Sequence, residues 1–526
     1  MPRDRVPHVS GAPAAGGPSA PRREADLALG LLIAASRVPF LAAGYGTDTD
    51  AWKLAFAARE IGRTGHYAPS RLPGFPVQEY VSALVWRGGP LALNGLTALW
   101  SVIAALLFLR LWRRLGGRDA ALATLAFAFV PALYVGSVSA MDYLWAEACV
   151  LGALNLALEG RALATGVLLG VATGCRITSA ALGLPLLMLL WPALRPPRAA
   201  RAALFAGVAG AIAALCYLPA YLRFGTGFLS FYEPQGAQKS LGDFLAGMLK
   251  PGPAPFPPAL IAGQATVGVF GPIGALAVGI AMLAALLAAA RRGPGTDRAL
   301  ALPRGVAPAL GVGLLIPLAL YLRLPHDEGY LIPALPFVLL LLAAATPRAV
   351  LRACLAAMVV SPFLLGVDVV PPKKGLTPEH RSPFARELKV SSETAVVDPL
   401  RGPLLMDADK RERTMAVAAR TLPALARWPD DAFLMVGVLH PVLFYYAPDN
   451  PRHPVYTDLL RAPDLADMLQ HGRRVFYLPD VRRRARRMAG YDPLAAGAAP
   501  LFPDDDAVGD SARGPRARGL PPTTGH

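Results

Sequence analysis

Charged side chains stand at the borders of long apolar stretches of this chain, where simple packing gives them no role. Asp48 and Asp50 follow the first apolar stretch, Asp142 begins a later one, and Arg71 and Arg176 lie at two other borders. A carboxylate in such a place can act as a general base, and a guanidinium can bind a phosphate through parallel hydrogen bonds. A charge left unpaired against lipid is costly, so each of these residues needs a partner or a function.

A second polar group lies late in the chain. His326, Asp327 and Glu328 separate two apolar stretches, with Arg323 before them and Tyr330 after them. If both groups lie on one side of a membrane, they form a single candidate site. The elements that must position them are therefore the apolar stretches themselves.

The composition indicates an integral membrane protein. The 526 residues are 54% hydrophobic and 17% charged, which is less charge than soluble proteins of this length carry. The net charge of +16 could suggest nucleic acid, but the bases sit mainly in short loops between apolar stretches, so no nucleic-acid partner is expected. The four cysteines all lie in apolar stretches and show no disulfide or zinc spacing.

Apolar stretches of about 20 residues, the length that crosses a bilayer core of about 30 Å, recur as far as Gly366. We expect about eleven spans, because arginine-rich loops then alternate with long or acidic loops, as the positive-inside rule requires. The expected spans are 27–45, 91–111, 120–138, 143–158, 162–173, 177–191, 202–222, 260–290, 306–322, 330–345 and 353–366. The N-terminus is then cytoplasmic and the acidic loops are external, in a bacterial-type inner (plasma) membrane.

The chain divides into four expected regions. Residues 1–25 are a proline- and arginine-rich leader without apolar period, and 504–526 is a similar polar end; both are expected to be disordered. Residues 26–366 form the helical membrane domain, with external loops at 46–90 and 223–259. Residues 367–503 are expected to be a small extracytoplasmic α/β domain, with strands at 404–407, 433–438 and 475–478 and helices at 412–426 and 482–489.

The first external loop predicts a surface helix. Trp52, Phe56 and Ile61 can share one face, Thr47 or Asp48 can cap the start, and Gly65 can end it. Such a helix would lie along the membrane surface. The segment PGFP at 73–76 then forces a turn before a second helix, 77–86, which is too short to span.

These motifs resemble the GT-C superfamily of integral-membrane glycosyltransferases, nearest to protein mannosyltransferases and lipid A aminoarabinose transferases. The resemblance rests on Asp48 with an aromatic residue four positions later, on the 65–67 and 73–76 motifs of the same loop, and on HDEGYLIPALPF at 326–337. It also includes Arg176, where the fifth and sixth expected spans meet. Many relatives carry Glu beside the first Asp, whereas this chain has Thr49 there and its second acid at Asp50.

The resemblance implies a hexosyl- or pentosyltransferase that moves a sugar from a polyprenyl-phosphate donor to an extracytoplasmic lipid, glycan or protein. Asp48 would be the general base of an inverting displacement, and Asp142 would orient the acceptor or a metal. The donor phosphate and sugar would bind to a polar set that comprises Asp50, Arg71, Arg176, Arg323, His326 and Tyr330. The 225–259 loop could close over the sugar. A divalent metal is possible, and no other cofactor is implied.

Each candidate also has a simpler interpretation. Asp48 and Asp142 could only cap helices, and Asp50 could only favour a helix start. Further simple roles are lipid-headgroup binding for Arg71, a helix C-cap for Arg176, a structural hydrogen bond for His326, an interfacial position for Trp52 and Tyr330, and solvation for Asp327, Glu328 and the basic run 482–487.

Two other functions remain open. A transporter or flippase of a lipid-linked saccharide would show inverted repeats and charges near the bilayer midplane, and the sequence shows no repeat. A polymerase or ligase of surface polysaccharide would use a diphosphate-linked donor instead.

Overall fold

The structure is a computed structural model that describes most of the chain. The described residues are 20–194, 196–229, 231–232, 238–239, 258–290, 297–303, 305–323, 327–370, 382–390, 393–426, 428–429, 431–446, 456–457, 460–478 and 481–502. Most of the expected leader, most of the expected closing loop 223–259 and the polar end 504–526 lie outside these residues.

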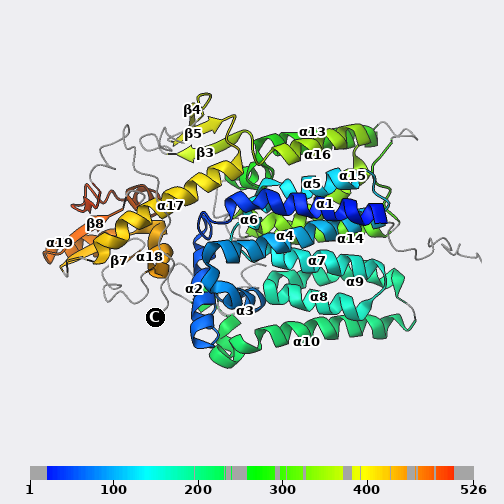
Figure 1. Cartoon of the computed structure of the whole chain (residues 1–526), viewed down its shortest axis with the longest axis horizontal. Helices are drawn as coiled ribbons and strands as arrows, with labels where there is room; N and C mark the ends of the chain where they lie inside the picture. The colour runs from blue at the N-terminus through cyan, green and yellow to red at the C-terminus, as the bar shows by residue number, and fades with distance from the viewer. Residues whose placement is uncertain are drawn as a thin grey trace, which may run out of the picture.

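The apolar part is a bundle of helices that run side by side (Figure 1). Its α-helices are α1 (Ala20–Arg37), α4 (Gly89–Arg114), α5 (Ala120–Phe129), α6 (Pro131–Ser137), α7 (Tyr143–Leu158), α8 (Ala162–Cys175), α9 (Gly183–Ala193), α10 (Arg198–Phe224), α12 (Pro258–Gly263), α13 (Val269–Ala290), α14 (Val306–Arg323), α15 (Leu335–Ala345) and α16 (Arg348–Val360). The 3₁₀ turns η3 (Ile177–Leu182) and η6 (Glu328–Ala334) lead into α9 and α15. Helix α2 (Thr49–Thr64) crosses the ends of the bundle, and α3 (Pro76–Val85) lies beside it.

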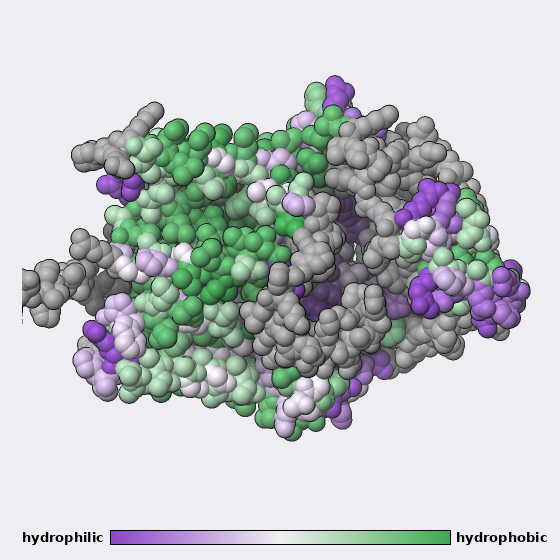
Figure 2. Space-filling view, turned by 180° about the vertical axis from the view of Figure 1, so that it is seen from behind, coloured by the Kyte–Doolittle hydropathy of each residue, from purple (hydrophilic) through white to green (hydrophobic). Residues whose placement is uncertain are grey.

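The expected helical membrane architecture is confirmed at a coarse level. Within the described ranges, five segments are long and apolar enough to cross a membrane: Pro76–Arg114, Arg198–Leu229, Ile261–Ala290, Val306–Arg323 and Glu328–Ala345. The pair α5 and α6, bent by 67° where Pro131 interrupts the helix, makes a sixth if it is one span. Figure 2 shows the matching surface, an apolar belt over the bundle with hydrophilic residues at its ends.

The expected count of about eleven spans is not reached by this measure, because several expected spans are short helices. Helices α7 and α8 have 16 and 14 residues, about 24 and 21 Å at 1.5 Å per residue. Helix α1 ends at Arg37, before the 3₁₀ turn that contains Pro39, instead of continuing to residue 45.

Ion pairs gather at the end of the bundle that lies away from α2. The loops expected on the inside contact one another there through Asp26–Arg113, Glu159–Arg110, Glu159–Arg114, Asp119–Arg348, Asp119–Arg352 and Asp297–Arg118, with N–O distances from 2.5 to 2.9 Å. The loops that were expected on one side therefore do meet at one end of the fold.

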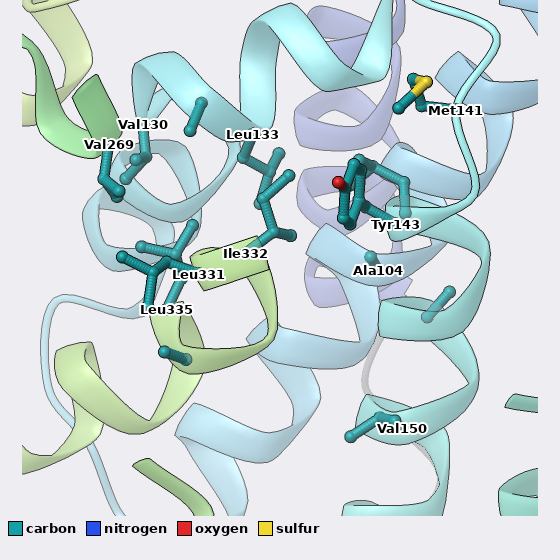
Figure 3. Packing of buried hydrophobic residues seen from close by; sticks show 14 of the residues in the cluster. Ala104, Val130, Leu133, Met141, Tyr143, Val150, Val269, Leu331, Ile332 and Leu335 are labelled. Carbon is teal, nitrogen blue, oxygen red and sulfur yellow. The ribbon is translucent and has the colours of Figure 1, made fainter. Parts of the chain in front are cut away.

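The core holds the broken helix pair against η6 (Figure 3). Val130 lies beside Val269 of α13, and Ile332 of η6 points toward Leu133 of α6. All four side chains are buried, with at most 1% of their surface exposed. This packing sets the position of the segment 138–142 that follows α6.

The C-terminal part contains two sheets. Strands β3 (Gly366–Val370), β4 (Arg386–Val390) and β5 (Glu393–Asp398) are antiparallel in the order β3-β5-β4. Strands β6 (Ala432–Met435), β7 (Tyr456–Thr457), β8 (Arg474–Tyr477) and β9 (Ala499–Pro500) are parallel in the order β7-β6-β8-β9. The connecting helices are α17 (Pro403–Ala426), α18 (His440–Tyr446), α19 (Ala462–Gln470) and α20 (Val481–Arg484).

One expected strand is wrong. Residues 404–407 form the first turns of α17, not a strand. The apolar run LLM is too short to separate a buried strand from a buried helical face, and Pro403 at the first helical position favours the helix. The basic run is a charged helical segment whose Arg482 and Arg486 both pair with Asp492.

Candidate functional site

The first loop is built on a capped helix. Asp48 is the N-cap of α2, and its Oδ1 accepts a hydrogen bond of 2.8 Å from the backbone N–H of Asp50. Gly65 ends α2 in the left-handed conformation. The expected helix is therefore present with its expected ends, and it places two carboxylates at its N-terminal turn. Its apolar residues Trp52 and Phe56 pack against Tyr445 and Phe444 of the C-terminal part.

Glu79 of α3 binds the segment 67–75, which leads from α2 back to α3. Its carboxylate accepts hydrogen bonds from the Tyr67 hydroxyl at 2.6 Å, from the Ser70 N–H at 2.6 Å and hydroxyl at 2.7 Å, and from the Phe75 N–H at 3.1 Å. Arg71 lies inside the loop that this acid closes. Glu79 was not among the candidates from the sequence, although it is the one acid of the mostly apolar segment 76–85.

Arg71 and Arg176 meet on one buried carboxylate. Asp142 is 1% exposed, and its two oxygens accept hydrogen bonds from Arg71 Nη2 at 2.9 Å and Arg176 Nη1 at 2.5 Å. Arg71 also pairs through Nε with Asp50 at 3.1 Å, and Asp50 pairs with Lys53 at 3.0 Å. The first loop, the α6–α7 connection and the end of α8 are thus joined by one network.

Two tyrosines frame the guanidinium of Arg176. Its Cζ lies 4.2 Å from the ring centre of Tyr143 and 4.9 Å from that of Tyr330. The Tyr143 hydroxyl donates to Asp327 at 2.8 Å, and Asp327 caps η6 by accepting from the Gly329 N–H. Tyr143 and Asp327 are functional candidates that the sequence did not single out as a pair, because their contact joins segments 184 residues apart.

An apolar groove begins at Arg176. It lies between η3, α14 and η6 and is partly open to the surroundings. Its lining residues are Arg176, Thr178, Ser179, Leu182, Ile316, Pro317, Leu320, Tyr330 and Pro333. A guanidinium thus lies at the border of a mostly apolar groove, two of whose walls belong to segments long and apolar enough to cross a membrane.

The acids of the site have opposite electrostatic environments. Burial alone would raise the pKa of Asp142, but Arg176 and Arg71 hold that pKa below the ordinary value of 3.8. Burial raises the pKa of Asp48, and the carboxylate of Asp50 raises it further. The two arginines thus favour the charged form of Asp142, whereas Asp48 is the more basic carboxylate.

The other polar residues of the two loop regions have the following positions. Arg323 is the last residue of α14, four positions before Asp327, so it ends on the same side of the bundle. His326 lies outside the described residues. Arg223 donates to the carbonyl of Tyr67 and so braces the first loop. Glu328 begins η6 and is half-buried, so the solvated-loop interpretation of this acid is not met.

A metal has no ready ligand set in the described ranges, where no three His, Cys, Asp or Glu side chains are grouped to hold one. Asp142 is occupied by Arg71 and Arg176, and Asp50 by Arg71 and Lys53.

Comparisons of the chain with protein-family models, with curated proteins and with solved structures found no match.

Proposed function

We propose that the protein is a membrane glycosyltransferase that moves a sugar from a polyprenyl-phosphate donor to an acceptor at the membrane surface. The observation that carries the proposal is the position of Arg176, which borders both the apolar groove and the charged network of Asp142 and Arg71. A polyprenyl phosphate has the complementary shape, an apolar chain that ends in an anion. An arginine with its aromatic neighbours suits a phosphate better than a freely hydrated lysine would.

In this proposal Asp142 positions the cations. With one oxygen on each arginine, it holds two guanidiniums from different loops beside each other, where they would otherwise repel. The remaining N–H groups can face the phosphate. Because its pKa is lowered by the same arginines, Asp142 is a weak base and its role is orientation.

Asp48 is the proposed base. One of its oxygens caps α2, and the pKa of the carboxyl is raised by burial, so the group is more basic than an exposed aspartate. The acceptor O–H or N–H would lose its proton to Asp48 as the acceptor atom bonds to the anomeric carbon. The bond from that carbon to the phosphate oxygen breaks, its electrons leave with the polyprenyl phosphate, and the configuration inverts.

The acceptor would enter between the bundle and the C-terminal part. The molecule is hollowed and hydrophilic there on the face seen in Figure 2. If the donor sits in the membrane groove, the C-terminal part lies on the acceptor side, which agrees with the proposed extracytoplasmic location of residues 367–503.

Two substitutions test the two halves of the site. In purified full-length protein in lipid nanodiscs, Asp48→Asn should lower transfer from polyprenyl-phosphate hexoses or pentoses by about 10²- to 10⁴-fold, while donor binding persists. Asparagine is an equally good N-cap, so α2 keeps its start. Arg176→Gln should instead weaken donor binding. Transfer is measured by mass spectrometry of the products, and binding by native mass spectrometry.

The matched control is Asp26→Asn, the same substitution in an ion pair at the opposite end of the bundle. It should leave transfer unchanged. Full transfer by Asp48→Asn would remove Asp48 from the mechanism, and unchanged donor binding in Arg176→Gln would remove the groove as the donor site.

One observation favours a flippase instead. The helix broken between α5 and α6 lies next to the site, and broken helices are common in transporters. Liposomes that contain the protein and a fluorescent polyprenyl-phosphate sugar separate the two functions. Movement of the lipid between leaflets without a transfer product, unaffected by Asp48→Asn, would support the flippase.

A further inference from the structure

We infer that Asp407 and Arg411 of α17 are positioning residues, which hold the loop before Asp48 and the loop before Asp142 in register. The inference rests on the proposed function for its catalytic meaning. The contacts that join the C-terminal part to both loops can be tested without measuring sugar transfer.

The link is a chain of short polar contacts. Thr47, directly before Asp48, donates its hydroxyl hydrogen to Asp407 Oδ1 at 2.8 Å. Asp407 Oδ2 pairs with Arg411 Nη2 at 2.5 Å, one turn later on the same helix. Arg411 then donates through Nη1 to the Val138 carbonyl at 2.6 Å and through Nη2 to the Ser139 hydroxyl at 2.8 Å.

The two loops also touch directly at this place. The Ala140 N–H donates to the Tyr45 carbonyl at 2.8 Å. A Cβ on Gly46 would lie 3.4 Å from the Cβ of Ser139 and 2.9 Å from that of Ala51. The two loops are therefore joined by a backbone hydrogen bond and have little free space between them at Gly46, and α17 contacts both loops.

The C-terminal part also contacts the first loop through a second helix. Helix α18 already packs on α2 through aromatic rings, with Tyr445 5.1 Å from Tyr45 and 5.9 Å from Trp52, and Phe444 4.7 Å from Phe56. Such contacts supply apolar burial and edge-to-face attraction.

Arg411, by contrast, is only 2% exposed. A buried ion pair is often no more stabilising than apolar residues of the same volume. What the pair adds is a fixed geometry. The guanidinium of Arg411 donates to two acceptors on the loop before Asp142, while its partner Asp407 accepts from the loop before Asp48. Asp142 lies three residues beyond Ser139, so the link acts on the site through the loop and not by touching substrate.

The test compares Arg411→Gln with Arg420→Gln in the full-length protein. Arg420 is an exposed arginine of the same helix that stacks on Phe502, 4.2 Å from its ring centre, so it controls for loss of an α17 arginine. Hydrogen–deuterium exchange should quicken in Arg411→Gln only, at the Ala140 amide, whose hydrogen bond joins the two loops, and at the Asp50 amide, which bonds the Asp48 cap next to Thr47. Unchanged exchange at both amides would overturn the inference whether or not the protein transfers sugar.

Transfer kinetics test the catalytic meaning. Arg411→Gln should lower kcat by about 10- to 100-fold, the scale of a small misplacement of reacting groups, with a smaller change in donor KM. Ser139→Ala removes the Arg411 contact from the other side, together with the hydrogen bond that the Ser139 hydroxyl donates to the Val135 carbonyl, and stays informative if Arg411→Gln does not fold. The double variant should lose no more than Arg411→Gln alone, because both act through one contact. Wild-type kcat in Arg411→Gln, or multiplied losses in the double variant, would refute positioning.

Discussion

At the scale of single residues, two aspartates in similar sequence positions have different partners in the structure. Asp48 and Asp142 both precede helices, and both could be simple caps from their place in the sequence. Asp48 does cap α2, whereas the Asp142 side chain makes no cap hydrogen bond and instead joins Arg71 and Arg176. The partners, not the residue type, make one acid more basic and the other a fixed anion.

This difference predicts a pH dependence. A general base works only when deprotonated, so transfer falls as pH drops through the pKa of Asp48. Since burial and Asp50 raise this pKa, the acidic limb of kcat/KM should lie above pH 3.8, the ordinary value. Arg71 lowers the same pKa, so Arg71→Gln should move the limb to still higher pH.

The measurement is a pH–rate profile of wild type and Arg71→Gln. Asp26→Asn, at the other end of the bundle, should keep the wild-type limb. A limb that moves to lower pH in Arg71→Gln would contradict the assignment of Asp48 as the base.

At the scale of elements, the first loop depends on a close approach of backbone to side chain. Gly74 has φ +100°, and a Cβ there would lie 2.2 Å from the Tyr67 hydroxyl oxygen. That hydroxyl donates to Glu79, the acid that gathers the loop. The glycine in the 73–76 turn is therefore needed for space as well as for backbone conformation.

Gly74→Ala should displace Tyr67 from Glu79. The expected cost is about 1–3 kcal/mol from the weakened buried hydrogen bond, plus about 1–2 kcal/mol for the positive φ. The control is Gly65→Ala, at φ +71° with open space around it, which should lose only the backbone part. Thermal unfolding in nanodiscs compares the two variants. Equal losses of stability would show that the contact of Gly74 with Tyr67 does not contribute.

At the scale of the whole molecule, the charges separate to two ends of an apolar bundle. Arginine-rich loops pair with the few acids at one end, and Asp50, Asp142 and the arginines of the candidate site meet at the other. We expect the first end in the cytoplasm and the second outside, by the positive-inside rule.

Cysteine labelling in spheroplasts tests this orientation. His66, His471 and Arg161 are exposed, the first two toward the expected outside and the third at the expected inside. A membrane-impermeant maleimide should label His66→Cys and His471→Cys but not Arg161→Cys until the membrane is permeabilised. The wild type, whose cysteines lie in the apolar helices, is the background control. Labelling of Arg161→Cys in intact spheroplasts would reverse the topology.

The sequence alone was enough for the features that depend on local pattern. Apolar length and composition predicted a helical membrane protein, and the residues around α2 predicted both of its ends. It failed at 404–407, where three apolar residues suit a strand or a helix equally well. The count of about eleven spans is not confirmed, because several of the expected spans are short or interrupted helices whose length does not by itself show that they cross a membrane.

Only the tertiary structure decided which charges meet. The contacts of Asp142 with Arg71 and Arg176, and of Arg411 with Ser139, join residues from 34 to 272 positions apart. No local periodicity encodes such pairs, because they arise when packed helices bring distant loops to one end of the bundle. Removing one member of a buried ion pair then costs stability, because it leaves the other charge buried without a partner.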